Sequence, residues 1–310
     1  MTISRRDFLK ITTAAGAGLA APWRLPGLRG AGGLMGVQRA FADAARDWLS
    51  NPALQPKFVN AVPDAMAPSF IYSPKRNTGE YHISVAKAKQ WTGLVDPATG
   101  KTLKTPIWGY GDAKDKVITW PGRTFQVKSV SAGGPAETTV NWYNELKPVK
   151  EHLLPVDTSL HWAYGLHGYT GYSIANDGVP IITHLHGGHT DYQFDGNPEF
   201  FYGPGGGRKQ VVGPQWEYVP DGFTTRFRYD NNVPAGNLWY HDHALGITRL
   251  NVYAGLAGFY FVRDEFDTGE VGNSLGLPAW PYEKAYAIQD RMFWNTGELF
   301  YPAYPGDPAY

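Results

Sequence analysis

Short runs of β-forming residues, each bounded by turn-forming residues, constrain the fold of this chain more than any other feature. From about Pro56 onward, runs rich in Val, Ile, Thr and aromatic residues are separated by Gly, Pro, Asn and Asp. Several runs alternate apolar and polar residues with the two-residue period of a half-buried strand. The runs are Glu80–Lys87, Arg123–Val130, Thr138–Leu146, Val179–His186, Thr224–Tyr229, Asn237–His243 and Leu256–Arg263. They predict an all-β sandwich or barrel, with helical character only in the N-terminal leader and in Asp43–Leu49.

The composition narrows the class of protein further. The chain has 37 Gly and 24 Pro, but its 43% hydrophobic content favours a loop-rich globular protein over a disordered one. The absence of cysteine excludes disulfides, thiolate zinc sites and a cysteine nucleophile within these 310 residues. The 28 basic residues are balanced by 28 acidic ones, and there is no basic run. We therefore do not expect nucleic acid to be the main partner.

The N-terminus has the layout of a bacterial twin-arginine signal. Arg5 and Arg6 stand in the string SRRDFLK and are followed by a small-residue apolar stretch, Ile11–Ala21. This stretch is too short and too rich in Gly, Ala and Thr for a stable membrane span, and Ala40-Phe41-Ala42 offers a cleavage site. Residues 1–42 are thus predicted to be a signal read by the twin-arginine export machinery, with a periplasmic or extracellular destination. The alternative is a disordered N-terminus with a chance arginine pair.

The strand pattern divides the remaining chain. Residues 43–264 carry all seven runs and are predicted to form one domain. Residues 265–281 gather Gly, Pro and acidic residues and are predicted to be a linker. Beyond them, Lys284–Arg291 has the composition of a strand, so residues 282–310 are expected to be the truncated start of a second domain. Alternatively, this tail packs back on the first domain.

Two H-x-H pairs carry the chemistry of the sequence. His184-Leu185-His186 and His241-Asp242-His243 each end a strand-like run. On a strand, residues i and i+2 point to the same side, about 6.6 Å apart, so two such pairs on neighbouring strands would gather four imidazoles. Neutral imidazole binds copper, zinc, iron or nickel, and without sulfur the order of affinities favours Cu(II).

The other histidines fit these patterns less well. His189 follows two glycines and is a weaker candidate for a further ligand, while an ordinary hydrogen-bonded role is expected for His82, His152, His161 and His167. Other H-x-H metal sites fail on spacing. A metallo-β-lactamase-like site would need an Asp-His step where Gly188-His189 stands, and a cupin would need Glu where Thr190 and Asp191 stand.

The two histidine motifs resemble those of a known family. THLHGGHTDYQFDG (Thr183–Gly196) and WYHDHALGITRLNVYAGLAGFYFVRD (Trp239–Asp264) are similar to the two N-terminal copper motifs of multicopper oxidases, especially the bacterial spore-coat laccase and bilirubin oxidase group. The resemblance extends over roughly Lys57 to Tyr310. It implies a cupredoxin-like Greek-key β-sandwich or barrel, followed by the beginning of a second cupredoxin domain.

The resemblance also implies roles for individual residues. His184 would bind the type 2 copper of a trinuclear cluster, and His186, His241 and His243 would bind the type 3 coppers. Asp195, eleven residues after His184, would supply protons to the cluster. Its alternative role is that of a turn-forming Asp-Gly pair with Gly196.

The implied activity is that of an exported copper-dependent oxidase. Such an enzyme couples one-electron oxidation of a small reducing substrate (a phenol, a bilirubin-like molecule or a metal ion) to four-electron reduction of dioxygen to water. The family accepts electrons at a type 1 copper that requires a cysteine thiolate, and this chain has no cysteine. It also carries only four of the eight histidines expected around the cluster, so these 310 residues alone are predicted to be inactive.

The sequence leaves two other functions open. One is a non-enzymatic periplasmic protein of multicopper-oxidase descent, although such a protein would have no need for paired imidazoles. The other is a small copper- or zinc-binding protein that uses only the four paired histidines.

Overall fold

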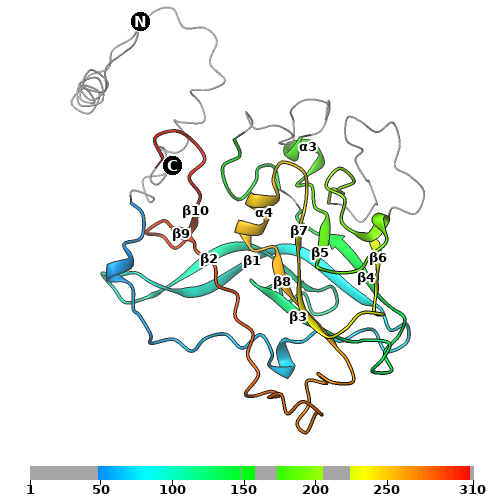
Figure 1. Cartoon of the computed structure of the whole chain (residues 1–310). Helices are drawn as coiled ribbons and strands as arrows, with labels where there is room; N and C mark the ends of the chain where they lie inside the picture. Colours follow the sequence, from blue (N-terminus) through cyan, green and yellow to red (C-terminus); the bar gives the residue numbers. More distant parts are fainter. Residues whose placement is uncertain (1–47, 148, 158–172, 205–223, 308–310) are drawn as a thin grey trace, which may run out of the picture. The chain divides into compact units, whose positions relative to one another are not determined.

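The computed structural model describes residues 48–147, 149–157, 173–204 and 224–307 (Figure 1). All of them belong to one compact unit, Arg46–Tyr310. The predicted signal, residues 1–42, lies outside the described residues, as do His161 and His167. Among the described residues, no helix combines the length and hydrophobicity that a membrane span needs.

Two four-stranded sheets form the body of this unit. One has the strand order β2-β1-β4-β6 and the other β3-β8-β7-β5. β1 pairs with β4 and β3 with β8 in parallel, whereas the other pairs are antiparallel. Strands adjacent in space are mostly distant in sequence, as in Greek-key folds. The strands are β1 (Tyr81–Val95), β2 (Thr102–Asp112), β3 (Gly122–Lys128), β4 (Glu137–Asn144), β5 (Thr183–His186), β6 (Arg226–Asp230), β7 (Gly236–Asp242) and β8 (Ala257–Arg263).

Aromatic side chains from both sheets interlock in one core. Ring centroids of Tyr110 in β2 and Tyr240 in β7 lie 4.9 Å apart at a steep angle, and Phe125 in β3 packs edge-on against Trp142 in β4. Such edge-to-face pairs contribute about 0.5–1.5 kcal/mol each beyond the area that they bury. Because the pairs cross from one sheet to the other, the two sheets form a sandwich, and the predicted all-β sandwich is confirmed.

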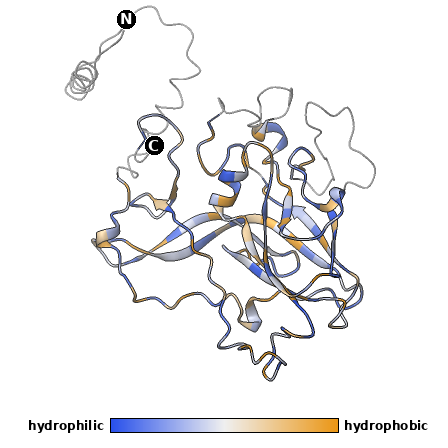
Figure 2. Ribbon diagram, in the orientation of Figure 1, coloured by the Kyte–Doolittle hydropathy of each residue, from blue (hydrophilic) through white to orange (hydrophobic). Residues whose placement is uncertain are grey.

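The strands follow the predicted alternation. In β4, Thr138, Val140, Trp142 and Asn144 are buried, while the residues between them are partly exposed. Figure 2 shows the corresponding succession of hydrophobic and hydrophilic segments along the strands. Period-two hydrophobicity therefore located most strands from sequence.

Strand β2 was missed because its sequence contains residues that disfavour strands. Pro106 is tolerated because β2 is an edge strand, where one row of backbone N–H groups needs no partner. Gly109 and Gly111 are needed because residues 117–119 cross close to β2. A Cβ on Gly109 would collide with the Thr119 carbonyl, and one on Gly111 with the Val117 carbonyl.

The expectation of helix only in the leader and Asp43–Leu49 was wrong. Trp48 and Leu49, the described part of that segment, are not helical. A helix is instead found later in the chain. This helix, α4 (Thr248–Ala254), buries Leu250 and Ala254 and is capped by Gly255, whose φ is 129°. Seven residues are too few to display a helical period clearly. The remaining helical turns are α3 (Ile174–Asp177) and the 3-10 turns η1 (Pro52–Leu54), η2 (Pro68–Phe70) and η3 (Tyr192–Phe194).

The predicted strand Val179–His186 is correct only in its second half. β5 begins at Thr183, and before it Ile181 makes only an isolated bridge to Tyr202. Pro180 lacks the N–H that a continuous ladder would require.

The tail differs from the predicted strand Lys284–Arg291. That segment is irregular, and the exposed fractions of Tyr286 and Ile288 are 61% and 98%. A short hairpin follows it, formed by β9 (Met292–Phe293) and β10 (Leu299–Phe300). The hairpin packs against the sandwich, because Thr105 Oγ1 donates to the Gly297 carbonyl at 2.7 Å and Leu299 joins the main core. The domain boundaries at residues 264 and 281 stay predictions.

Candidate metal centre

Antiparallel pairing of β5 with β7 brings the two H-x-H pairs together. In the register, His184 lies opposite His241, and His186 lies opposite Trp239. His243 follows directly after the end of β7. The ring centroid of His184 lies 5.6 Å from that of His186, 5.4 Å from that of His241 and 5.1 Å from that of His243. The four rings thus lie near one another, and three of them, His184, His186 and His241, form the group whose ligand atoms could share an ion, with the His243 ring beside it.

The pleat of β7 separates these rings from the core. Tyr240 points between the sheets, where its hydroxyl donates to the Arg123 carbonyl at 2.7 Å. Trp239 and His241 point to the opposite face, because successive strand residues alternate sides. Trp239 is 39% exposed and stacks on His241, with ring centroids 4.2 Å apart and planes inclined by 28°. It also stacks on His186 at 5.1 Å, so one indole supports two of the histidines.

Two ring nitrogens converge closely enough to share an ion. His241 Nδ1 donates to the Asp242 carbonyl at 2.7 Å, which leaves the lone pair of the neutral ring on Nε2. His186 Nδ1 lies 3.3 Å from that Nε2. A tetrahedral ion with metal–nitrogen bonds of about 2.0 Å holds two ligand nitrogens about 3.3 Å apart. The spacing therefore matches an edge of a metal coordination shell, and candidate ligand atoms of His184, His186 and His241 all lie within 4.8 Å of one another.

The loop after β5 orients His184. His184 Nδ1 donates to the Asp195 carbonyl, and Asp195 Oδ1 lies 3.3 Å from the same nitrogen. Thr190 Oγ1 holds that carboxylate by donating to Oδ1 at 2.9 Å. These contacts leave the Nε2 lone pair of a neutral His184 ring for a ligand.

Gly196 lets this loop approach the strand. It has φ of +79°, and a Cβ there would lie 2.6 Å from the Thr183 carbonyl oxygen and 2.8 Å from His184 Cα. Both the backbone conformation and the close contact require glycine. The Asp-Gly step is therefore a turn element, and Asp195 also contacts His184.

The electrostatics of the cluster favour neutral rings. Burial lowers the pKa of His241 to about 4. Burial, reinforced by the nearby His184, also lowers the pKa of His243. His243 Nδ1 is buried and has no hydrogen-bond partner among the described residues. Neutral imidazoles with free lone pairs are what a transition metal requires, so the residues fit a bound metal ion.

The lone histidines differ in their surroundings. His82 Nδ1 is 2.7 Å from the Tyr143 hydroxyl, and both ring nitrogens of His152 are hydrogen-bonded. His189 is exposed and does not join the group of rings able to share an ion. Sequence reasoning overlooked Trp239 and Thr190, although both lie inside the quoted motifs. Stacking and carboxylate support depend on the strand register, which the motifs alone did not provide.

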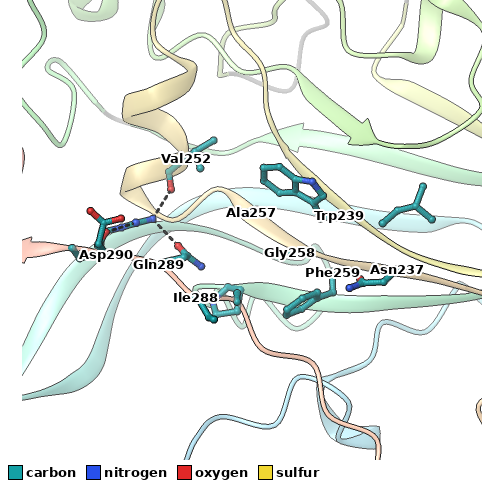
Figure 3. Close-up of a pocket in the computed structure, with 13 residues that line it drawn as sticks. Asn237, Trp239, Val252, Ala257, Gly258, Phe259, Ile288, Gln289 and Asp290 are labelled. Carbon is teal, nitrogen blue, oxygen red and sulfur yellow. Dashed lines mark hydrogen bonds between the residues drawn. The ribbon is translucent and has the colours of Figure 1, made fainter. Parts of the chain in front are cut away.

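A groove of about 410 Å³ lies between strands β7 and β8 and the tail (Figure 3). Trp239 and Phe259 line it from the strands, and Ile288 and Gln289 line it from the tail. Trp239 therefore belongs to both the histidine cluster and this groove.

The N-terminus matches a known targeting signal. Residues 2–22 match the family model described as the TAT (twin-arginine translocation) pathway signal sequence. This confirms the predicted twin-arginine signal, and the protein is exported across the membrane.

Much of the chain is similar to proteins named laccases and multicopper oxidases. It is 37% identical over 203 residues to a laccase of Bacillus stratosphericus, covering 66% of this chain and 33% of that one. It is 31% identical over 255 residues to a laccase of Bacillus subtilis, covering 82% of this chain and 41% of the relative. Among solved structures, the McoA multicopper oxidase 2F4 variant of Aquifex aeolicus matches with a TM-score of 0.44 and 18% identity, over 75% of this chain and 36% of that chain. The chain thus spans between a third and about two fifths of these relatives.

Proposed function

We propose that this chain, which is homologous to multicopper oxidases over about a third of their length, provides part of the copper cluster of an exported oxidase. The proposal rests on one observation: four imidazoles of the two H-x-H motifs lie around a common volume on the outer face of β5 and β7. The copper would be held by His184, His186, His241 and His243. Copper is the metal proposed because the relatives are named laccases and multicopper oxidases.

The four histidines would divide between the ions by position. His186 Nδ1 and His241 Nε2, 3.3 Å apart, would bind one type 3 copper together. His243 would bind the other type 3 copper, and His184 would bind the type 2 copper. Trp239 would hold the rings of His186 and His241 in their planes.

The reaction would be the oxidation of a small reducing substrate by dioxygen. When bound, the copper ions would supply one-electron redox steps that link the two reactants. Overall, four substrate equivalents each lose one electron, and dioxygen takes up four electrons and four protons to give two waters. The donor is proposed to be a phenol, a bilirubin-like molecule or a metal ion.

Asp195 is the proposed source of protons at the cluster. Its side chain is 52% exposed, lies beside His184 and is oriented by Thr190. A carboxylate in this position can take up a proton from solvent and pass it on to the cluster beside His184. Replacement by Asn would preserve the hydrogen bond from Thr190 and remove the proton.

These 310 residues are proposed not to oxidise substrates by themselves. The type 1 copper of a multicopper oxidase needs a cysteine thiolate, and the chain has none. Phenol oxidation by the purified chain with added Cu(II) would contradict this part of the proposal.

Copper content tests the assignment of the ligands. The purified chain, loaded with Cu(II) and freed of excess metal, should retain copper, and His184→Ala and His241→Ala should lose most of it. His189→Ala is the matched control, because His189 is exposed and outside the cluster. Unchanged copper in both cluster variants would overturn the proposal.

A second candidate function is copper binding without oxidation. It is supported by three histidines of this chain whose ligand atoms already lie within 4.8 Å of one another, together with the absence of cysteine from these 310 residues. Copper loading gives the same result for both candidates, so turnover separates them. Joined to the remaining part of an oxidase, the chain should support substrate oxidation under the first proposal, whereas a binding protein would retain copper and show no turnover.

A further inference from the structure

A buried carboxylate lies between the two histidines of the second pair. The Asp242 side chain is inaccessible to solvent and points away from the cluster, toward the inner side of β7. Its Oδ2 accepts from the Ile182 backbone N–H at 3.0 Å, and its Oδ1 accepts from the Ala244 N–H at 3.1 Å. Asp242 therefore fastens the end of β7 to the residue before β5 and to the turn after His243.

Asn251 of helix α4 extends this connection. Its Nδ2 donates to Asp242 Oδ1 at 2.8 Å and to the Pro180 carbonyl at 3.1 Å. Asn251 is itself wholly buried. A buried amide with both hydrogens used in this way fixes α4 against the strand ends that carry the histidines.

His152 completes the chain of hydrogen bonds from a segment remote in sequence. Its Nδ1 accepts from the Leu154 N–H at 3.0 Å, so the ring hydrogen must lie on Nε2. That Nε2 then donates to Asn251 Oδ1 at 2.9 Å, and this contact determines which way the Asn251 amide faces. The ring also packs edge-on against Trp108, with centroids 4.4 Å apart. The hydrogen bonds from Leu154 through His152 and Asn251 to Asp242 therefore have fixed directions.

We propose that His152 and Asn251 are positioning residues for the histidine cluster, acting through the Asp242 carboxylate that joins His241 to His243. This inference rests on the proposed function, since it concerns the affinity of the four histidines for copper. Without His152, the Asn251 amide could rotate, and its oxygen would face the Asp242 carboxylate. The H-D-H turn would then lose its fixed position relative to His184 and His186.

Three variants of His152 test the inference. His152→Gln keeps a donor toward Asn251 and an acceptor for the Leu154 N–H, whereas His152→Phe keeps the ring packing on Trp108 and removes both hydrogen bonds. Loss of an outer partner of metal ligands typically weakens metal binding 10–100-fold. We expect His152→Phe to weaken Cu(II) affinity by about tenfold or more, and His152→Gln to remain within a few-fold of the parent chain. His152→Met, which removes the same bonds with a flexible side chain, replaces His152→Phe if the latter does not fold.

Cu(II) affinity is measured on the full chain by competition with a chelator, and the electron paramagnetic resonance spectrum of the bound Cu(II) is recorded. Val85→Ala, a truncation at a wholly buried position of β1, is the control for lost stability alone. It should leave affinity and spectrum unchanged. A folded His152→Phe or His152→Met chain with the parent's affinity and spectrum would overturn the inference.

The two proposals fail in different ways. If His184→Ala and His241→Ala abolish tight Cu(II) binding but the His152 variants do not weaken it, only the positioning role is lost. If the cluster variants bind Cu(II) like the parent chain, the proposed function itself fails, and the positioning role fails with it.

Discussion

The two faces of the β5–β7 pair have the same backbone and opposite chemistry. On the inner face, Tyr240 and Leu185 are buried in the aromatic core, and Thr183 lies under the Tyr110 hydroxyl at 3.2 Å. On the outer face, His184, His186 and His241 leave ring nitrogens directed at one another. Packing and hydrogen bonds satisfy the inner side chains, whereas the outer imidazoles hold ring nitrogens close enough together to share an ion.

This difference separates residues that hold the fold from residues available for a ligand. Inner-face side chains should dominate the free energy of unfolding, because they bury large apolar surfaces. Outer-face imidazoles should affect copper binding while contributing little to stability. Asp242 belongs to neither group, because it is a buried carboxylate on the inner side that contacts the backbone next to the histidines.

The largest expected effect on stability comes from truncating the inner face. Tyr240→Ala removes ring contacts with Tyr110, Phe125 and Trp142, and should lower the free energy of unfolding by about 4 kcal/mol. Urea denaturation followed by circular dichroism measures the change. The neighbouring Trp239→Ala is the control, because its side chain is 39% exposed, and it should cost about 1 kcal/mol or less. Equal losses in the two variants would contradict the division between the faces.

Measuring stability at a series of pH values tests the contribution of His152, a buried polar residue. Burial, with a smaller contribution from Arg249, lowers the pKa of His152 from 6.5 to about 4, despite its hydrogen bonds to Asn251 and Leu154. The unfolded chain therefore binds the proton first as pH falls. The contribution of neutral His152 to the free energy of unfolding is complete above pH 6.5. It decreases by about 3 kcal/mol as the pH falls to 4.

Comparison with His152→Gln isolates this effect. Glutamine does not titrate in this range, so the parent chain should lose about 3 kcal/mol relative to the variant between pH 7 and pH 4. Burial raises the pKa of Asp242 to about 7, which makes its own contribution change in the opposite direction, but Asp242 is present in both chains. Urea midpoints measured across this range give the difference. A constant difference between the two chains would show that His152 is not buried in its neutral form.

Alanine substitutions at two glycines test whether the loop that carries Asp195 must lie close to His184. Gly196 and Gly133 have φ of +79° and +76°, but only a Cβ on Gly196 would meet other atoms within 4 Å. Gly133→Ala should cost about 1 kcal/mol for the backbone conformation. Gly196→Ala should cost about 2–3 kcal/mol, because it adds a collision with β5, and it should weaken Cu(II) binding by moving His184. Unfolding and copper titration of both variants check this, and equal costs would exclude the collision.

The grouping of the histidines on the outer face was largely predictable from sequence. The strand register and the hydrogen bonds that hold these histidines in place were not. Two H-x-H pairs at strand ends predicted a four-histidine cluster, since strand residues two apart share a side. The pairing of His184 with His241 required the register of β5 on β7, which no local pattern contains. The contact between His152 and Asn251 joins residues 99 positions apart, so sequence assigned His152 only an ordinary hydrogen-bonded role.

The fold shows the same limit. The sandwich followed from alternating runs, because hydrophobic periodicity is local. β2 was hidden by Pro106, Gly109 and Gly111, whose presence makes sense only beside the crossing segment 117–119. Residues 284–291 likewise have a strand-like composition but an irregular path, with Ile288 almost fully exposed, which composition alone does not reveal.

The smallest expected change in stability comes from the outer face itself. His186→Ala removes an exposed ring that contacts His241 and Trp239, so the metal-free chain should change by no more than about 0.5 kcal/mol. Cu(II) at a hundred times its dissociation constant should stabilise the parent chain by about 2.7 kcal/mol, because it binds only the folded state. His186→Ala should lose most of this copper-dependent stabilisation, whereas the exposed control His189→Ala should keep it. Thermal unfolding with and without Cu(II) measures both quantities. If His186→Ala retained the full stabilisation, the lone pairs of the outer face would have no part in binding the metal.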